Sequence, residues 1–390
     1  GVQTCALPIS HLNPNNPLDV VKFALEHQTQ MVIVGPEAPL IAGVSDALRS
    51  EGIAVFGPSQ AAAQLEGSKS FAKEVMAAAG VPTGMARECS TIEEVISAMD
   101  DFGAPYVIKA DGLAAGKGVI VTSDRDAAID HAMKFISMGI LVEEFLDGQE
   151  VSLFFLSDGH SVVPLSPAQD FKRALDNDEG PNTGGMGAYS PLPWLPEGFV
   201  EEVEEKVALP TVQEMARLGA PFVGLLYCGL IITKRGLRVI EFNARFGDPE
   251  TQVVLRRLNS SLSNLLYKSA TGHLEGVSDP EFSKEVAITV VLASEGYPET
   301  SAPNRPIYGV GDAEKAGVEV CHAATAWAEN KDGEEVLTAT GGRVLTVVAV
   351  GKDFHHARTH AYAGIEKIQL QGSHYRKDIA AKVATPGAAS

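Results

Sequence analysis

The stretch "KADGLAAGKGV", residues 109–119, decides how the fold is interpreted. It places a lysine between glycines directly after a β-rich run, as a nucleotide-binding P-loop does. Its spacing differs from that of a P-loop, because three residues separate Gly112 from Gly116 where a P-loop has four. Gly118 also stands where a P-loop has its metal-binding hydroxyl. The stretch is therefore not a P-loop.

A phosphate-binding role is still favoured for the glycine-rich loop 112–118. Small residues let backbone N–H groups approach an oxyanion closely, and Lys109 and Lys117 would add charge. A glycine-rich surface hairpin is the alternative. The flanking β runs "PYVIKAD" (105–111) and "GVIVTSD" (118–124) are joined by a short connection, which predicts an antiparallel pair.

Composition excludes several classes of protein. A chain of 390 residues suggests two to four domains, and its net charge of −19 argues against non-specific binding to nucleic acid or anionic membranes. The longest apolar run, 223–232, is about half of the ~20 residues that a membrane span needs, and a buried strand is predicted there. The cysteines are far apart without a CxxC pair, which predicts reduced thiols in a cytoplasmic protein. They are Cys5, Cys89, Cys228 and Cys321.

A parallel α/β unit is predicted near the start of the chain. Apolar runs at 30–40 and 52–59 each contain a Gly-Pro pair and flank a helical stretch at 41–51. A further helix is predicted over 66–80, with Ser68 as its N-cap and Gly80, followed by Val-Pro, as its end. From about residue 83 short β runs and helices alternate differently, and a compact α+β domain is predicted from about residue 286.

The segment "VIEFNARFGDPE", 239–250, is the strongest candidate for a metal site. Residues two apart in a strand share a face, so Glu241 and Asn243 would point together. A carboxylate and an amide oxygen suit Mg²⁺, which prefers hard oxygen ligands. A solvated polar edge is the alternative. The turn that follows favours a functional site, because it gathers three more charged residues: Arg245, Asp248 and Glu250.

A long polar loop, 169–191, is the second candidate region. Such loops are usually functional or disordered. Asp170 could hold an amine, while Lys172 and Arg173 could hold a carboxylate or phosphate. The residues alone leave a substrate site and a linker equally open.

Six blocks together resemble one family. They are "VGPEAPL" (34–40), "FGPSQAAAQLEGSKSFAKE" (56–74), "YVIKADGLAAGKGVIV" (106–121), "VEEFLDGQEVS" (142–152), "GPNTGGMGAYSP" (180–191) and "VIEFNARFGDPETQ" (239–252). Their order and spacing are similar to those of the phosphoribosylamine–glycine ligases, also called glycinamide ribonucleotide synthetases, ATP-grasp enzymes of early purine biosynthesis. The resemblance extends from about residue 20 to about residue 380.

The resemblance implies a multidomain α/β and α+β chain with an ATP-grasp fold. The expected parts are a truncated, Rossmann-like amino-terminal α/β domain (1–82), an ATP-grasp lid (83–150), an ATP-grasp catalytic subdomain (151–284), a carboxy-terminal α+β domain (285–384) and a frayed tail (385–390). Residues 1–19 are expected to be foreign or irregular, because "GVQTCALPIS" (1–10) matches nothing in the family and a "GNGGREH"-type turn is absent. In the family that turn would hold the ribosylamine phosphate.

The resemblance also implies roles for individual residues. ATP contacts are implied for Lys69, Lys109, Gly112, Gly116, Lys117, Gly118, Glu144, Phe145, Leu146 and Glu150. Mg²⁺ or Mn²⁺ would be held by Glu241 and Asn243. Glycine and 5-phosphoribosylamine would lie near Asp170, Lys172, Arg173, Gly184, Gly185, Met186 and Gly187. Catalytic roles are implied for Arg245, Lys109 and Asp248.

The reaction implied is ligation of glycine to 5-phosphoribosylamine, driven by ATP through glycyl phosphate. The expected partners are these small molecules, with no nucleic acid and no membrane, and a monomer is expected. Because of the departure at the amino terminus, two alternatives stay open. One is a truncated form that binds nucleotide without completing ligation, and the other is an ATP-grasp carboxylate–amine ligase with a different acceptor.

Overall fold

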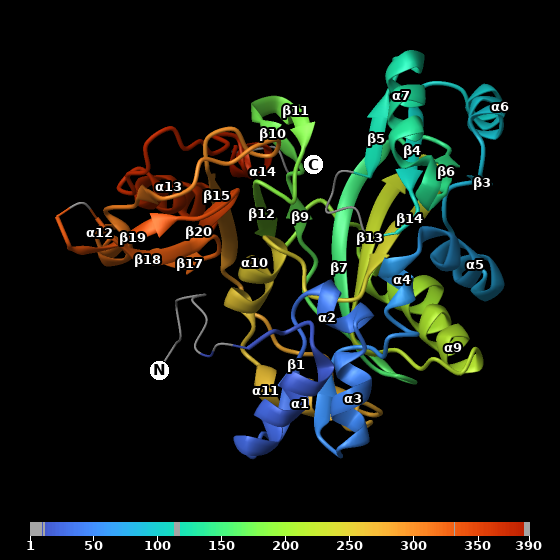
Figure 1. Cartoon of the computed structure of the whole chain (residues 1–390), viewed down its shortest axis with the longest axis horizontal. Helices are drawn as coiled ribbons and strands as arrows, with labels where there is room; N and C mark the ends of the chain where they lie inside the picture. The colour runs from blue at the N-terminus through green and yellow to red at the C-terminus, as the bar shows by residue number, and fades with distance from the viewer. Residues whose placement is uncertain (1–9, 11, 113–117, 331, 386–390) are drawn as a thin grey trace.

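The computed structural model describes residues 10, 12–112, 118–330 and 332–385. In Figure 1 the long strands of a central sheet run between a lid at the top, amino-terminal elements at the bottom and a carboxy-terminal domain at the left. Residues 1–9, the loop positions 113–117 and the tail 386–390 lie outside the described residues, and so do the predictions made for them. No helix of the described part is both long and apolar enough to cross a membrane.

The amino-terminal elements form the parallel unit that the sequence predicts. Strands β1 and β2 pair in parallel, with Met31 opposite Ala54. Helix α1 begins after the N-cap Asn16, whose side chain accepts a hydrogen bond from the Leu18 backbone N–H. The elements are α1 (Pro17–Glu26), β1 (Met31–Ile33), α2 (Glu37–Ile41), α3 (Val44–Ser50) and β2 (Ala54–Phe56).

Two short-linked helices lead from this unit to the lid. They are α4 (Gln64–Gly67) and α5 (Lys69–Ala79). Ser68 caps α5, because its hydroxyl accepts a hydrogen bond from the Phe71 N–H at 3.1 Å. Gly80 ends the helix in the left-handed conformation (φ 69°), which glycine adopts readily. The predicted cap and stop are both confirmed.

The lid is a small α+β unit with its own hydrophobic core. Its sheet has the strand order β3–β6–β4–β5, and β4 pairs with β5 antiparallel, as predicted. Apolar side chains of α6 and α7, among them Met99 and Ala128, pack with Ile140 and other apolar residues of this sheet. The elements are β3 (Ala86–Cys89), α6 (Ile92–Phe102), β4 (Tyr106–Ala110), β5 (Val119–Thr122), α7 (Arg125–Phe135), the 3₁₀ turn η1 (Ile136–Met138) and β6 (Ile140–Glu143).

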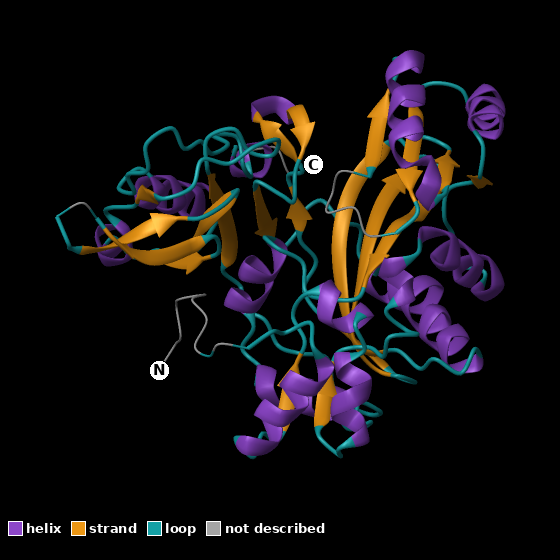
Figure 2. Cartoon of the chain, viewed as in Figure 1, coloured by secondary structure: helices purple, strands orange, loops and turns teal. Residues whose placement is uncertain are grey.

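The central sheet is covered by helices on both faces (Figure 2). Its order is β14–β13–β7–β8, and all its pairs are antiparallel. Leu153 and Phe155 pack toward α8 and α9, whereas Phe154 and Leu156 pack toward α11, which follows the alternation of a strand. The strands are β7 (Gly148–Asp158), β8 (Val162–Pro164), β13 (Val223–Thr233) and β14 (Gly236–Asn243). The helices are α8 (Phe199–Val203), the π-helix η3 (Glu204–Ala208), α9 (Leu209–Arg217), α10 (Glu250–Arg257) and α11 (Leu262–Ala270).

The carboxy-terminal domain contains a five-stranded sheet with the order β17–β20–β15–β12–β9. Its strands are β15 (Val286–Ala293), β17 (Glu319–His322), β20 (Arg343–Gly351), β9 (Gln169–Asp170) and β12 (Gly187–Ser190). A smaller sheet holds β16 (Arg305–Pro306), β18 (Thr325–Glu329) and β19 (Glu335–Ala339), and the helices are α12 (Val310–Lys315), α13 (Phe354–Ile365) and α14 (Ala381–Ala384).

The boundary expected between residues 284 and 285 does not separate these sheets. Strands β9 and β12 come from the segment 169–191, and Gly187 pairs with Val290 of β15. The reason is that β15 is buried along its whole length and needs a partner on each side. The predicted loop is therefore partly strand. Between these strands a short hairpin projects, made of β10 (Arg173–Leu175), the turn Asp176–Asp178 (η2) and β11 (Glu179–Asn182).

Candidate active site

One cavity of about 1500 Å³ opens where the lid, the central sheet, the amino-terminal elements and the carboxy-terminal domain meet. Most of the predicted site residues line it. They are Lys69, Lys109, Gly112, Gly118, Glu144, Phe145, Leu146, Glu150, Asp170, Lys172, Arg173, Gly184, Glu241, Asn243, Arg245 and Asp248. Residues that are far apart in the sequence thus line one cavity.

Three of the remaining predicted residues do not line the cavity. Met186 is fully buried, and Gly187 lies in β12. Gly185 (φ 112°) packs against the turn after β14, where an added Cβ would lie 2.5 Å from Pro249 Cδ. These positions serve packing between two loops. Gly116 and Lys117 lie outside the described residues.

A buried ion-pair network surrounds Lys109. Its Nζ lies 3.0 Å from Glu143 Oε2 and 3.3 Å from the Ile240 carbonyl oxygen, and Lys73 Nζ lies 3.3 Å from the same carboxylate oxygen. Lys109 and Glu143 are each only 5% exposed, so each charge needs the other. Sequence reasoning missed Lys73 and Glu143. Lys73 could have been found, because it lies one helical turn after Lys69.

Lys69 is tied to the root of the glycine-rich loop. Its Nζ donates to the Gly112 carbonyl at 3.0 Å, and its backbone N–H donates to Asp111 Oδ1 at 2.6 Å. Asp111 Oδ2 also accepts a hydrogen bond from the Ser68 hydroxyl at 3.3 Å. Burial lowers the pKa of Lys69. Asp111, in the segment 109–119, therefore connects the lid to the first turn of α5.

Glu241 lies on β14 opposite Gly229, with Asn243 two residues further along. Burial would raise the pKa of this carboxyl, but surrounding cations outweigh burial and hold the pKa below its ordinary value. They are Lys172, Lys109, Lys69 and Arg245. The backbones of Glu241 and Asn243 pair with β13, whereas no described residue makes a hydrogen bond or ion pair with either side chain, so both side-chain oxygens are available to a ligand.

These two oxygens fit one face of a hard divalent cation. The described residues contain no group of three or more His, Cys, Asp or Glu side chains that could enclose a metal by itself. A cation here would need further oxygens, which phosphates and water commonly supply to Mg²⁺.

Arg245 is held by carboxylates of the amino-terminal part. Its Nη2 lies 3.2 Å from Glu66 Oε1, and its Nε lies 3.6 Å from Glu37 Oε2. Glu66 also accepts a hydrogen bond from the Ala244 N–H at 2.8 Å. Burial raises the pKa of Glu66 against the opposing charge of Arg245. No pattern in the sequence indicates this pairing, because the partners are far apart in the chain.

Acidic and basic side chains meet at the base of the hairpin. Lys172 Nζ lies 2.6 Å from Glu150 Oε2, so a predicted ribose contact and a predicted substrate contact are paired. Burial raises the pKa of Asp170 to about 7 against the opposing charge of Lys172. Glu250 adds to this rise, and its Oε1 accepts a short hydrogen bond of 2.6 Å from the Tyr227 hydroxyl.

The segment after β6 forms the other end of the cavity. Glu144 accepts a hydrogen bond from the Met85 N–H at 3.0 Å and pairs with Arg235 at 2.8 Å. Its side chain is thus occupied, while Phe145 is 42% exposed beside it. An apolar ring and free backbone groups suit the flat edge of a base.

Arg343 of β20 joins two loops of the site. It pairs with Asp248 at 3.0 Å and donates to the carbonyl oxygens of Gly184 and Asp248 at 2.8 and 2.6 Å. Tyr297 adds a contact, because its hydroxyl accepts a hydrogen bond from the Gly184 N–H at 3.0 Å. Asp248, predicted as catalytic, is therefore held by a residue of the carboxy-terminal domain.

Lys69 of α5 and Lys109 of the lid line the same cavity as the carboxylate and the amide on β14. This arrangement is that of the ATP-grasp class of ATP-binding enzymes. Three models of the phosphoribosylglycinamide synthetase family match the chain: the N domain over residues 1–66, the ATP-grasp (A) domain over 67–251 and the C domain over 287–382. The chain belongs to the phosphoribosylamine–glycine ligase family, whose members are ATP-dependent carbon–nitrogen ligases of purine biosynthesis.

Individual relatives agree with this assignment. A phosphoribosylamine–glycine ligase from Leifsonia xyli subsp. xyli is 61% identical over 95% of this chain and 89% of its own length. One from Streptomyces coelicolor is 57% identical, with 91% and 84% covered. A crystal structure of phosphoribosylamine–glycine ligase from Thermotoga maritima superposes with a TM-score of 0.79 at 31% identity, covering 92% of this chain and 88% of that one.

The match of the N domain corrects one expectation. The amino-terminal unit is not missing, because the N-domain model matches from residue 1 to residue 66. The matched region includes residues 1–19, which were expected to be foreign or irregular. That expectation depended on one absent glycine-rich turn, whereas the domain is defined by the whole α/β unit. The alternative of a truncated nucleotide-binding form loses its basis.

Proposed function

We propose that the chain ligates glycine to 5-phosphoribosylamine, giving glycinamide ribonucleotide, ADP and phosphate. The observation that carries this proposal is that three groups meet in one cavity. They are the lysines of α5 and of the lid, the carboxylate and amide of β14 whose side chains have no partner among the described residues, and the charged pair at the base of the hairpin. The family of the chain supports it.

Nucleotide binding is assigned to the lid side of the cavity. Lys69 and Lys109 contact the phosphates of ATP, and the backbone around Gly112 and Gly118 covers them. The segment 144–146 borders the adenine, and Glu150 accepts from the ribose hydroxyls. Since Glu150 also pairs with Lys172, the ribose and the acceptor site share one charged group.

Glu241 and Asn243 would hold Mg²⁺ or Mn²⁺. Such an ion, when bound, neutralises phosphate charge and polarises the phosphoryl group that is transferred. The chain itself supplies the two oxygens on one strand face and keeps Glu241 ionised through the surrounding cations.

The first step activates the glycine carboxylate. One of its oxygens attacks the γ-phosphorus of ATP, the bond to the bridging oxygen breaks, and ADP leaves as glycyl phosphate forms. Arg245 stabilises charge on the phosphoryl oxygens, and Glu66 keeps its guanidinium directed into the cavity. Asp248, held by Arg343, fixes the turn that carries Arg245.

The second step forms the amide. The amine nitrogen of phosphoribosylamine attacks the carbonyl carbon, phosphate leaves, and the nitrogen loses a proton. Asp170 accepts a hydrogen bond from an amine, and Lys172 and Arg173 neutralise carboxylate or phosphate. A closed lid keeps water from the acyl phosphate.

A coupled assay for ADP tests this function. We expect ADP to form at a high rate only when MgATP, glycine and freshly prepared phosphoribosylamine are all present. ADP formation with glycine and a different amine would instead identify an ATP-grasp ligase with another acceptor. Nucleotide binding without turnover under any of these conditions would contradict the proposal.

We also propose that the enzyme acts as a monomer, because one chain supplies every wall of the cavity described above. Light scattering of the purified protein, with and without MgATP, measures the mass of the active species.

A further inference from the structure

Arg376 is a fully charged side chain buried at the back of the substrate hairpin. It is 1% exposed and lies in the segment after α13 of the carboxy-terminal domain. Its Nε and Nη2 donate to the two carboxylate oxygens of Asp378 at 2.8 and 2.6 Å. Its Nη1 donates to Asp178 Oδ1 at 2.8 Å and to the Arg173 carbonyl at 3.2 Å. One guanidinium thus joins this segment to both ends of the strand–turn unit 173–178.

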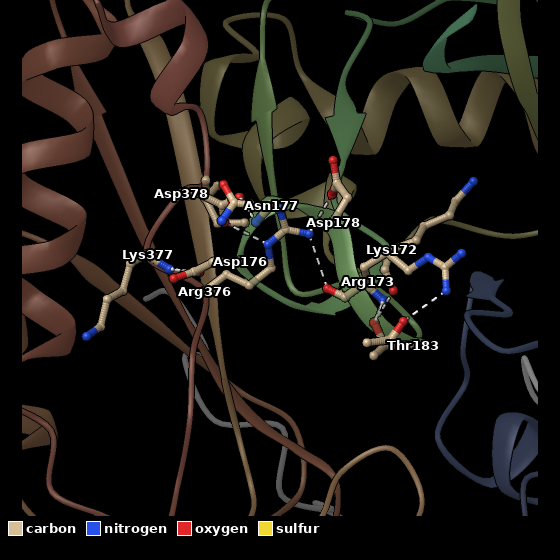
Figure 3. A network of polar contacts seen from close by, with 12 residues as sticks. Lys172, Arg173, Asp176, Asn177, Asp178, Thr183, Arg376, Lys377 and Asp378 are labelled. Atoms are coloured by element: carbon tan, nitrogen blue, oxygen red, sulfur yellow. Dashed lines mark hydrogen bonds and ion pairs between the residues drawn. The ribbon is translucent and has the colours of Figure 1, made fainter. Parts of the chain in front are cut away.

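Two hydrogen bonds from backbone N–H groups, one on each side, also join the hairpin and this segment. The Asn177 N–H donates to Asp378 Oδ2 at 2.9 Å, and the Lys377 N–H donates to Asp176 Oδ1 at 2.7 Å. Figure 3 shows Arg376 between Asp378 on its own segment and Asp178 on the hairpin. The turn of the hairpin is therefore held by a segment about 200 residues later in the chain.

The turn needs such support. Asn177 (φ 60°) and Asp178 (φ 56°) are consecutive non-glycine residues in the left-handed region. This conformation costs free energy and persists only where surrounding contacts determine it. Three of the contacts named above end on this turn, one each at Asp176, Asn177 and Asp178. Without Arg376 the turn would lose its buried charge partner, and the hairpin would be free to relax.

Arg376 also reaches the residues that face the cavity. Its guanidinium stacks over the ring of Phe171 with 4.8 Å between Cζ and the ring centroid. Phe171 lies between Asp170 and Lys172, and its backbone is hydrogen-bonded to Met186 and Gly187. A ring fixed on one side by a buried cation restrains the residues before and after it.

We propose that Arg376 is a positioning residue for the acceptor half of the reaction. It fixes Phe171 and the hairpin, so that Asp170 and Lys172 face the substrate from a rigid support. The inference rests on the proposed function, because it concerns the same substrates. It places the final part of the carboxy-terminal domain in control of acceptor geometry, and it reaches the nucleotide half of the cavity only through the pair of Lys172 with Glu150.

Lysine cannot replace this side chain fully. Four hydrogen bonds from its planar fork reach Asp378, Asp178 and a carbonyl at once. The plane also stacks on the Phe171 ring, whereas an ammonium group is a point charge. Arg376→Lys therefore keeps the charge and loses the fork. The test compares it with Arg376→Ala and with Asp178→Asn, which removes the hairpin's charge partner at a side chain that is 62% exposed.

Steady-state kinetics with each substrate varied in turn decide the proposal. A misplaced reacting group can lower the rate by about 10²-fold, so we expect Arg376→Ala to lower kcat/KM for glycine and phosphoribosylamine by that order. The KM for ATP should stay within about twofold, and Arg376→Lys and Asp178→Asn should lie between wild type and Arg376→Ala. Arg256→Ala is the matched control, because Arg256 pairs with Glu319 between the same two domains but away from the hairpin.

Three outcomes would overturn the proposal. One is unchanged acceptor kinetics in Arg376→Lys and Asp178→Asn, which retain the fold even if Arg376→Ala does not. Another is an equal loss of ATP affinity, measured by titration with MgATP, because that indicates general damage. The third is an equal loss in Arg256→Ala. If the wild-type protein shows no glycine-dependent ADP formation, the proposed function itself fails, and this result is distinct from the other three.

Discussion

Glu241 is a carboxylate surrounded by cations that make no direct contact with it. Lys172, Lys109 and Lys69 all lower its pKa against the effect of burial, yet no described residue bonds to its oxygens. Such a cluster of cations is suited to an anion such as a nucleotide phosphate. The free carboxylate among them would in turn suit a positive ion that accompanies the phosphate.

Glu241→Gln should therefore weaken the metal dependence of the reaction. The amide keeps the size of the side chain and removes its charge, so the Mg²⁺ concentration for half-maximal rate should rise by about 10–100-fold or more. The measurement is the initial rate against Mg²⁺ at fixed ATP. Glu335→Gln, at an exposed strand position of β19, is the control. An unaltered titration would remove Glu241 from the ligand set.

Asp170 gives the site a dependence on pH. Its pKa is raised from an ordinary 3.8 to about 7, so the side chain holds its proton in the folded state until the pH passes about 7. Because folding raises the pKa, ionisation of Asp170 opposes folding, and this destabilisation is present above pH 7 and lost as the pH falls toward 3.8. Function has the opposite dependence, because the carboxylate that accepts from an amine exists only above that pH.

We expect kcat/KM for the acceptor to fall as the pH drops through about 7 in the wild-type enzyme. Asp170→Asn should have a lower rate and lack this limb, since the amide does not titrate. The pH profile is measured between about pH 5.5 and 8.5 with saturating MgATP. A limb that persists in Asp170→Asn would assign the titration to another group.

At the scale of elements, Asp111 joins the lid to the start of helix α5. Asp111 follows β4 and accepts hydrogen bonds from the N–H groups of Lys69 and Ser70 at 2.6 and 3.4 Å. A carboxylate at the first turn of a helix satisfies free N–H groups and interacts favourably with the helix dipole. The lid strand thus stabilises the helix that carries Lys69 and Lys73.

Asp111→Ala should lower the free energy of unfolding by about 1 kcal/mol and raise the KM for ATP. Asp124→Ala is the matched control, because Asp124 caps α7 through the N–H groups of Asp126 and Ala127 and does not reach the cavity. Both variants should lose similar stability in chemical denaturation. Only Asp111→Ala should change ATP kinetics, and an equal change in Asp124→Ala would contradict the link.

Elements with a local signal could be predicted from the sequence, and elements without one could not. Strand β13 was predicted from its apolar run, and α5 from Ser68 and Gly80, because these signals are local. Strands β9 and β12 have two and four residues in a polar, glycine-bearing segment, which is too short for a period to appear. Strand β12 pairs with β9 and with β15, and β15 lies about 100 residues later in the chain.

The residues of the site were likewise predicted only where their signal is local in the sequence. Lys109 and Glu241 stand in motifs whose chemistry is readable, and both line the cavity. Glu66 and Arg343 were missed, because each matters only through a partner that tertiary structure brings to it. Conversely, Met186 lies within a motif of the family but is buried in the packing of the domain.

At the scale of the whole molecule, the lid has a core separate from the rest. The cluster around Met99 and Ile108 contains only lid residues, whereas a second cluster joins the amino-terminal elements, the central sheet and the carboxy-terminal domain. Separate cores allow parts of a protein to open independently. The lid can therefore move over the nucleotide without disturbing the hairpin.

Met99→Ala should destabilise the lid alone. The side chain is fully buried, and such a truncation costs about 2–5 kcal/mol. Hydrogen exchange followed by mass spectrometry should show faster exchange in α6, β4 and β6 and unchanged exchange in β15 and β20. Val347→Ala, in the other core, should give the reverse. Faster exchange in both regions for either variant would show that the cores are coupled.

The contact between Arg376 and the hairpin also bears on how the protein comes to be active in the cell. The turn at Asn177 and the Asp378 that holds it are 201 residues apart. At ~5–20 residues per second, the ribosome makes the hairpin on the order of 10–40 s before its support. During that interval a nascent chain can form the strands that line the nucleotide half of the cavity, while the hairpin still lacks its contacts with Arg376 and Asp378. If Arg376 positions the acceptor site as proposed, full turnover is expected only after the carboxy-terminal segment has been synthesised and docked.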